Sequence, residues 1–363
     1  MKLKDFVFFN PIERLPKNQI FRKISMDQLS PHSRNVESDV FEAYKGGSKF
    51  RNGDTLFARI TPCLENGKTS FVSCLEDNEV GFGSTEFIVV RAKPGLSLPL
   101  FVYYLMTTDY VRSKAIISMT GSSGRERVQQ VALDNIIIPN YSLDYQQHIV
   151  NTIGSVDDLI ECNNKFLRAA QQLLSIKYKS YCLFTDEKSE LSLLVERTGK
   201  ILKNKEWFNS KIIDLSTMPN DNIFIDDFSD GDNFTTNVKT VNDMDLLYGS
   251  IRPYFKKAGF NWNSKYIAGS VYSFSPKHES DFLWILATIC SDDFHKYTAS
   301  NSQGTKMPII NWDTFIRYKV PYSKQISEKF TKELKPLFMK AVLKLKQNEI
   351  LKTIKKKLLE KYF

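Results

Sequence analysis

A polar loop in the first half of the chain combines groups that can bind phosphates and base edges. The loop reads Thr120-Gly-Ser-Ser-Gly-Arg-Glu-Arg127. Its glycines free the backbone, Ser122 and Ser123 offer hydroxyl groups, and the guanidinium groups of Arg125 and Arg127 can make paired hydrogen bonds to phosphate or guanine. We therefore select these two serines and two arginines as candidate DNA contacts. The alternative interpretation is a solvated turn.

Further candidates follow a phrase that occurs twice. The first copy reads Asp54-Thr-Leu-Phe-Ala-Arg-Ile-Thr-Pro62, and the second reads Asp245-Leu-Leu-Tyr-Gly-Ser-Ile-Arg-Pro253. Each copy is predicted to be a strand. Basic residues that follow it could line one face together with a later polar loop. In the second half of the chain this loop is Ser300 to Lys306. Arg59 and Arg252 could equally be surface residues of a strand. The candidates of this group are Arg59, Lys68, Arg252, Lys256, Lys257, Gln303 and Lys306.

The sequence lacks the motifs of common catalytic sites. It has no G-x-S-x-G, no nucleotide-binding P-loop, no H-E-x-x-H and no Asp-Pro-Pro-Tyr or Asn-Pro-Pro-Tyr tetrapeptide of an amino-methyltransferase. Gly81-Phe-Gly83 lacks the third glycine of a dinucleotide site and is interpreted as a turn. The adjacent acids Asp157 and Asp158 are expected on a helix face. The histidines and cysteines have no metal-ligand spacing, so we predict no catalytic residue, no metal and no cofactor.

Composition favours a globular protein, and its net positive charge is compatible with an anionic partner. The 363 residues are 42% apolar and carry a net charge of +9, and residues 323–363 alone hold twelve lysines against four glutamates. That basic segment is either a solvated helix face or a surface near phosphates or an acidic subunit. No apolar run is long enough for a membrane span, and Asp5 and Asn10 interrupt the apolar opening. We expect a cytoplasmic protein without a membrane partner.

The repeated phrase predicts a duplicated α+β domain. We expect one α+β domain over residues 1–143 and a second over 185–322, with long helices over 144–184 and 323–363. In the first domain, Pro99 to Ile117 is predicted as a helix and Ile136 to Pro139 as a final strand. Two homologous domains joined by matched helices should have pseudo-twofold symmetry.

The long helices are expected to pair. Apolar residues from Ile149 to Tyr181 recur at spacings of three, four and seven, as in a coiled coil, and Asn163 and Lys177 fall on the same seam. Polar seam residues favour one specific register. Pro336 should kink the second helix or mark its start. We predict an antiparallel pair that holds the two domains apart.

Several phrases resemble one known family over the whole chain. They are Asn52-Gly-Asp-Thr-Leu-Phe-Ala-Arg-Ile-Thr-Pro62, Glu65-Asn-Gly-Lys-Thr69, Gly81-Phe-Gly-Ser-Thr-Glu-Phe87, Thr120-Gly-Ser-Ser-Gly-Arg125 and Tyr145-Gln-Gln-His-Ile-Val150. The first four resemble the target recognition domain of type I restriction–modification specificity subunits, and the last resembles the opening of their spacer helix.

The resemblance implies a noncatalytic subunit that recognises double-stranded DNA. It further implies a bipartite target, read one half per domain, and docking of adenine methyltransferase subunits and of restriction subunits that translocate DNA. Two other classes remain open from the sequence alone. One is a coiled-coil scaffold whose globular ends bind protein, and the other is an enzyme with a fused nuclease or methylase activity.

Overall fold

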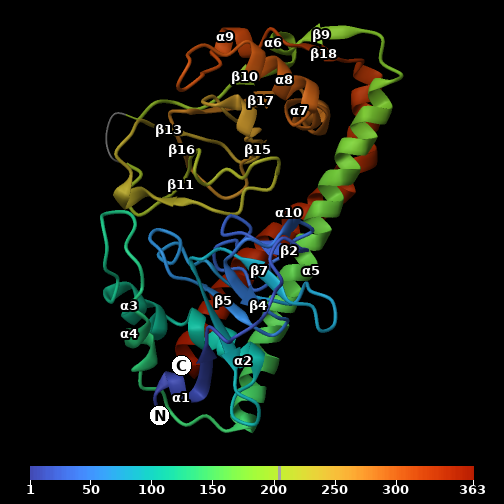
Figure 1. The fold of residues 1–363 in the computed structure, drawn as a ribbon. Helices are drawn as coiled ribbons and strands as arrows, with labels where there is room; N and C mark the ends of the chain where they lie inside the picture. The colour runs from blue at the N-terminus through green and yellow to red at the C-terminus, as the bar shows by residue number, and fades with distance from the viewer. Residues whose placement is uncertain (203–205) are drawn as a thin grey trace. The chain divides into compact units, whose positions relative to one another are not determined.

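The computed structural model describes residues 1–202 and 206–363, which form two compact units (Figure 1). Unit 1 comprises Met1–Ile160 and Leu351–Phe363, and unit 2 comprises Glu161–Ile350. Two long helices, α5 (Leu143–Cys182) and α10 (Lys324–Tyr362), each contribute a segment to both units. The two long helices predicted from the sequence are therefore confirmed.

Unit 1 is built from two small sheets. One has the strand order β1-β8-β5-β6 and is antiparallel throughout, and the other has the order β3-β2-β7-β4, in which β2 and β7 are parallel. The strands are β1 (Val7–Phe9), β2 (Ile20–Ile24), β3 (Phe41–Ala43), β4 (Ser48–Phe50), β5 (Thr55–Ala58), β6 (Thr69–Phe71), β7 (Gly81–Gly83) and β8 (Phe87–Ala92).

The described part of unit 2 repeats this topology. Its sheets have the orders β10-β17-β14-β15 and β12-β11-β16-β13, and β11 and β16 are again the parallel pair. The fold class predicted from the repeated phrase, two α+β units of one plan, is confirmed. The strands are β10 (Val195–Arg197), β11 (Lys211–Ile213), β12 (Ser229–Asp230), β13 (Val238–Thr240), β14 (Leu246–Gly249), β15 (Ala258–Phe260), β16 (Tyr266–Ala268) and β17 (Val271–Pro276), with an extra pair β9 (Lys188–Glu190) and β18 (Lys319–Pro321).

Short helices occur in the same order in both units, one before the first strand of the antiparallel sheet and three after its last. Unit 1 has α1 (Leu3–Phe6), α2 (Pro99–Thr107), α3 (Asp109–Ile117) and α4 (Gln130–Asp134). Unit 2 has α6 (Leu191–Leu194), α7 (Phe282–Ile289), α8 (Asp292–Ser300) and α9 (Trp312–Phe315), with 3-10 turns η1 (Gly231–Asn233), η2 (Pro253–Phe255) and η3 (Glu279–Asp281). None of the helices in the described ranges is long and apolar enough to cross a membrane.

Three local predictions are wrong. The helix expected from Pro99 to Ile117 is broken at Thr108, whose extended backbone and side chain cap α3 by accepting a 3.3 Å hydrogen bond from the amide of Val111. The expected strand at Ile136 to Pro139 makes only an isolated bridge, between Ile137 and Lys2. The expected turn at Gly81–Gly83 is the interior strand β7. A Cβ at Gly83 would lie 2.1 Å from the Ile24 carbonyl oxygen, so close strand packing explains that glycine.

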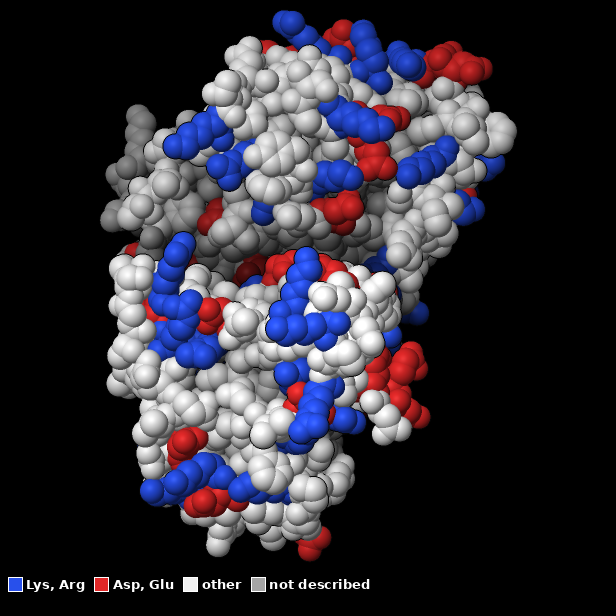
Figure 2. Space-filling model, in the orientation of Figure 1, with Lys and Arg blue, Asp and Glu red and all other residues white. Residues whose placement is uncertain are grey.

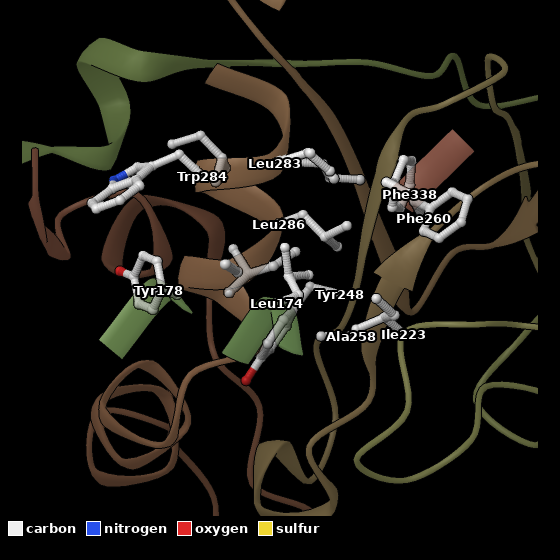
Figure 3. Close-up of a cluster of buried hydrophobic side chains, with 14 of the residues drawn as sticks. Leu174, Tyr178, Ile223, Tyr248, Ala258, Phe260, Leu283, Trp284, Leu286 and Phe338 are labelled. Atoms are coloured by element: carbon white, nitrogen blue, oxygen red, sulfur yellow. The ribbon is translucent and has the colours of Figure 1, made fainter. Parts of the chain in front are cut away.

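The long helices are part of the core of each unit. In unit 2, Leu174 and Tyr178 of α5 and Phe338 of α10 pack with α7 and the sheet, as Figure 3 shows. The rings of Tyr178 and Trp284 have centroids 4.8 Å apart, and the Trp284 indole donates a 2.9 Å hydrogen bond to the Pro321 carbonyl oxygen. Because these aromatic side chains are buried in the same cluster, the helix segments and the sheet of this unit fold as one body.

Within each unit the helix segments pair antiparallel, as predicted. In unit 1, Asp157 and Lys355 form a buried ion pair of 2.7 Å. In unit 2, the buried Asn163 amide donates to Asn348 Oδ1 at 2.8 Å, and Lys177 pairs with Glu333 at 2.6 Å. These polar contacts favour one register, because any shift would leave buried groups without partners.

Pro336 does not start the second helix, since α10 begins at Lys324 and includes the proline. Proline removes one backbone hydrogen bond, which costs a helix about 3 kcal/mol. The neighbouring side chains of Leu334 and Phe338 are both buried, and their packing offsets that loss.

Candidate nucleic-acid interface

In unit 1, the predicted loop closes as a hairpin against the end of strand β5. The amide of Thr120 donates to the Arg127 carbonyl at 3.1 Å, the amide of Arg127 donates back at 2.9 Å, and Ile60 forms a bridge with Arg127. Gly121 and Gly124 have φ of 142° and 73°, a backbone region that favours glycine. The glycines therefore allow the tight turn that carries Ser122, Ser123 and Arg125, all exposed.

An acidic residue that the sequence analysis missed binds two of the predicted arginines. Glu86 accepts hydrogen bonds of 2.6 to 3.0 Å from Nε and Nη2 of Arg127, and Nε of Arg59 lies 4.0 Å from the same carboxylate. Hydrogen bonding to Glu86 raises the pKa of Arg127, so this guanidinium stays charged. Nε of Arg59 is buried and makes no hydrogen bond with a described residue. The arrangement holds two guanidinium groups beside the hairpin.

Lys68 and Lys257, both predicted as DNA contacts, occupy equivalent positions in the two units. Each lysine carbonyl accepts the amide of the last residue of a central strand, Ala58 or Gly249. Lys68 Nζ donates to the Met26 carbonyl at 2.9 Å, and Lys257 Nζ donates to the Leu215 carbonyl.

The turns that receive these ammonium groups follow β2 and β11, which are also equivalent strands. Lys257 also donates to the Met218 carbonyl at 2.7 Å, and burial lowers the pKa of Lys257. Both lysines therefore fasten a turn to the sheet in this conformation, a role that the sequence alone did not indicate.

In unit 2, a second hairpin closes in the same way. The amides and carbonyls of Gln303 and Ile309 bond to each other at 2.8 and 2.9 Å, and Ile309 forms a bridge with Ile251. The amide of Arg252 donates to the Pro308 carbonyl at 2.7 Å. Gln303 and Lys306, which remain predicted DNA contacts, are exposed.

The two remaining basic candidates of unit 2 lie at either end of η2. Arg252 and Lys256 have φ of 50° and 54°, so both hold the left-handed conformation that side chains other than glycine rarely adopt. Nε of Arg252 is buried without a hydrogen bond to a described residue, and Lys256 Nζ pairs with Asp292 at 2.9 Å. Hydrogen bonding to Asp292 raises the pKa of Lys256. The turn therefore presents two cations from a constrained backbone.

Strand pairing assigns equivalent positions at the two hairpins. The amide of Arg59 donates to the Glu86 carbonyl and the amide of Ser250 donates to the Ser270 carbonyl, each at 3.0 Å. Arg127 and Ile309 are the residues that bridge to Ile60 and Ile251. Arg59, Glu86 and Arg127 of unit 1 therefore correspond to Ser250, Ser270 and Ile309 of unit 2. The same backbone arrangement therefore carries an ionic cluster in unit 1 and neutral side chains in unit 2.

Charged side chains of both signs occur on the face of the molecule shown in Figure 2. Figure 2 shows Lys and Arg side chains distributed among acidic ones on the visible face. The side chains of Arg125 and Lys306 are exposed and make no hydrogen bond or ion pair with a described residue, which leaves both cations available to an anionic ligand. No group of His, Cys, Asp and Glu in residues 1–202 and 206–363 is arranged to hold a metal ion.

A second cluster that the sequence analysis missed surrounds Asp157 in unit 1. Tyr104 donates a 3.0 Å hydrogen bond to Asp157, whose other oxygen accepts from Lys355, and Arg34 donates to Asp158 at 2.6 Å. Burial raises the pKa of Tyr104. Asp158 lies on the helix face as predicted, but Asp157 is buried, because the neighbouring helix supplies a lysine for it.

Comparison with known proteins confirms the resemblance to specificity subunits. No family model matches the chain. The type I restriction enzyme EcoAI specificity subunit of Escherichia coli is 32% identical over 134 residues, 36% of this chain and 23% of that protein. The EcoEI specificity subunit of the same organism is 34% identical over 138 residues, 37% and 23% of the two chains. The chain thus spans about a quarter of the length of these curated relatives.

A solved structure shows the same fold. The S subunit of a type I restriction–modification system from M. genitalium aligns over 100% of this chain and 95% of its own, with a TM-score of 0.54 and 15% sequence identity. The identity is low, so this likeness concerns the fold alone.

Proposed function

We propose that the protein is the noncatalytic DNA-recognition subunit of a type I restriction–modification complex. In this proposal the domains over residues 1–143 and 185–322 each read one half of a bipartite double-stranded target. The observation that carries the proposal is the hairpin that closes on the end of the central strand in both units, with different side chains on one frame. Two contact surfaces of different chemistry suit a target with two different halves.

We further propose that the helix segments 144–184 and 323–363 dock the partner subunits. Adenine methyltransferase subunits, and restriction subunits that translocate DNA, are the partners expected for such a complex. Exposed apolar side chains on both helices support a protein interface. In unit 2, Ile176 of α5 and Leu343 of α10 are both 64% exposed. Large apolar side chains that remain exposed on both paired helices favour a further protein partner.

The experiment combines the chain with a candidate adenine methyltransferase subunit from the same genome and sequences the methylated DNA. The proposal predicts one bipartite motif with a fixed gap, and salt-sensitive binding of that motif, because phosphate contacts release counterions. Methylation should require both proteins. A chain that bound only protein, with no salt-sensitive DNA binding, would instead be a scaffold. Activity of the purified chain alone would contradict the noncatalytic assignment.

A further inference from the structure

An apolar surface lies at the hairpin of unit 2, where unit 1 has arginines and serines. Tyr254 is 52% exposed and Met307 is 52% exposed, and Phe255 and Ile309 are 38% and 42% exposed. The rings of Tyr254 and Phe255 have centroids 4.7 Å apart. We call Tyr254, Phe255, Met307 and Ile309 the apolar patch.

Two segments side by side build the apolar patch. The hydrogen bond from Arg252 to the Pro308 carbonyl and the bridge between Ile251 and Ile309 hold the hairpin against the start of η2. Met307 and Ile309 therefore lie on the structural counterpart of the loop that carries the candidate contacts of unit 1, and Tyr254 and Phe255 lie on the adjoining turn η2. The counterpart in unit 1 is hydrophilic, since residues 120–127 contain no apolar side chain.

Charge at the patch favours a nucleic acid as its occupant. Residues 251–256 and 303–309 contain Arg252, Lys256 and Lys306 and no acidic residue. Asp292 of α8 neutralises Lys256 in part, whereas Lys306 is exposed and unpaired among the described residues. Cations around exposed apolar side chains complement DNA, which offers phosphates beside the major groove and thymine methyl groups within it.

We propose that unit 2 recognises the C5-methyl groups of thymine in its half-site through the apolar patch. This inference rests on the proposed function and assigns a specific chemistry to one of its two surfaces. Unit 1, with Arg125 and Arg127 on its hairpin, recognises base edges by hydrogen bonding. Apolar contact with the thymine methyl and guanidinium contact with guanine are distinct ways of reading the major groove.

The test replaces thymine by uracil, which removes the methyl group and leaves base pairing intact. Affinity of the chain in complex with its methyltransferase subunit is measured for duplexes that carry uracil in one half-site at a time. Each methyl group removed from the half-site of unit 2 should weaken binding about fourfold, from the transfer free energy of one buried carbon. Uracil in the other half-site should leave affinity unchanged.

Variants connect the effect to the patch. In the double variant Tyr254→Ala, Met307→Ala, uracil should no longer weaken binding in either half-site. Both side chains are half-exposed, so the variant should fold. The matched control is Leu193→Ala, which removes a side chain that is 65% exposed elsewhere in unit 2 and should retain the full uracil effect.

Three outcomes would overturn the inference while sequence-specific binding persists. They are no uracil effect in either half-site, an undiminished uracil effect in the double variant, and loss of methyltransferase binding by the double variant when DNA is absent. The last outcome would identify the patch as a protein-docking surface. Absence of sequence-specific binding to unmodified DNA would refute the proposed function itself.

Discussion

The two units share one topology but differ in the chemistry at equivalent positions. Arg59, Glu86 and Arg127 form an ionic cluster beside the hairpin of unit 1. Neutral side chains, among them Ile309, take these positions in unit 2. Because backbone pairing around the hairpins is the same, the sheets and the strand ends define the frame. The side chains at the hairpin can therefore change without changing the fold.

The helix segments show the same contrast. In unit 1 the seam contains the ion pair of Asp157 and Lys355, and in unit 2 it contains the amides of Asn163 and Asn348. Removing one partner of a buried ion pair leaves a bare charge, whereas removing one amide leaves a neutral group without a partner. The comparison therefore predicts a larger penalty in unit 1 than in unit 2.

The largest expected effect is that of Asp157→Ala. The change leaves Lys355 charged and buried and should reduce the free energy of unfolding by about 3–5 kcal/mol. Thermal unfolding followed by circular dichroism measures it. Asn163→Ala should cost about 1–3 kcal/mol. The control Lys356→Ala, on a side chain that is 72% exposed, should change little. Equal effects of the two seam substitutions would contradict the contrast.

The next largest effect on stability is expected for Lys257, which fastens the turn after β11 to the sheet. Lys257→Met removes hydrogen bonds from an ammonium group to two carbonyls and should cost about 1.5–3 kcal/mol of stability. If this lysine has no phosphate contact, the salt dependence of DNA binding should be unchanged. Lys306→Ala is the matched control, with little effect on stability and a smaller salt slope. A reduced salt slope in Lys257→Met would show that the lysine also contacts DNA.

A pH-dependent effect should distinguish the two units. Burial, with a contribution from the nearby Lys256, lowers the pKa of His295 from 6.5 to about 4. Below pH 6.5 the unfolded chain takes up a proton that the folded chain does not, so unit 2 should lose stability as pH falls from 6.5 to 4, by at most about 1.4 kcal/mol per pH unit.

Tryptophan fluorescence measures that loss in the full chain, because Trp207, Trp262, Trp284 and Trp312 all lie in unit 2. The variant His295→Gln should flatten the dependence. An unchanged pH profile in this variant would show that other groups cause the acid sensitivity.

Local patterns and the repeat predicted much of this molecule from sequence. The repeated motif predicted two α+β units, and the structure shows why: its strand residues are buried in both units, which constrains their types. The apolar stripe around Asn163 predicted the helix pair. The sequence analysis missed the break at Thr108 because the apolar residues on both sides of it resemble one continuous helix. The threonine in fact caps the start of α3. The pair Gln146-Gln147 near the start of α5 has no counterpart in the sequence of α10. The structure nevertheless contains an equivalent contact.

The equivalent contact is a hydrogen bond between the first turns of the long helix and the residue before a short helix, made by different side chains in the two units. Gln146 accepts the amide of Leu98, which precedes α2, at 2.8 Å, and Ser327 donates to Asp281, which precedes α7, at 2.6 Å. No spacing rule predicts such an exchange.

The missed site residues depend on tertiary contacts. Glu86 meets Arg127 across 41 residues, and Asp157 meets Lys355 across 198. A single sequence without the fold holds no signal for either pair.

The central claim, that each unit reads one half of the target, is tested most directly by altering one hairpin and sequencing the methylated DNA. The variant carries Ser122→Gly, Ser123→Gly and Arg125→Ala and retains Arg127. It therefore keeps the length of the loop and the ion pair with Glu86. Loss of a base contact should reduce discrimination by about 1–3 kcal/mol. The account predicts a methylated motif that becomes degenerate in one half, with the other half and the gap unchanged. Equal degeneracy in both halves would contradict it.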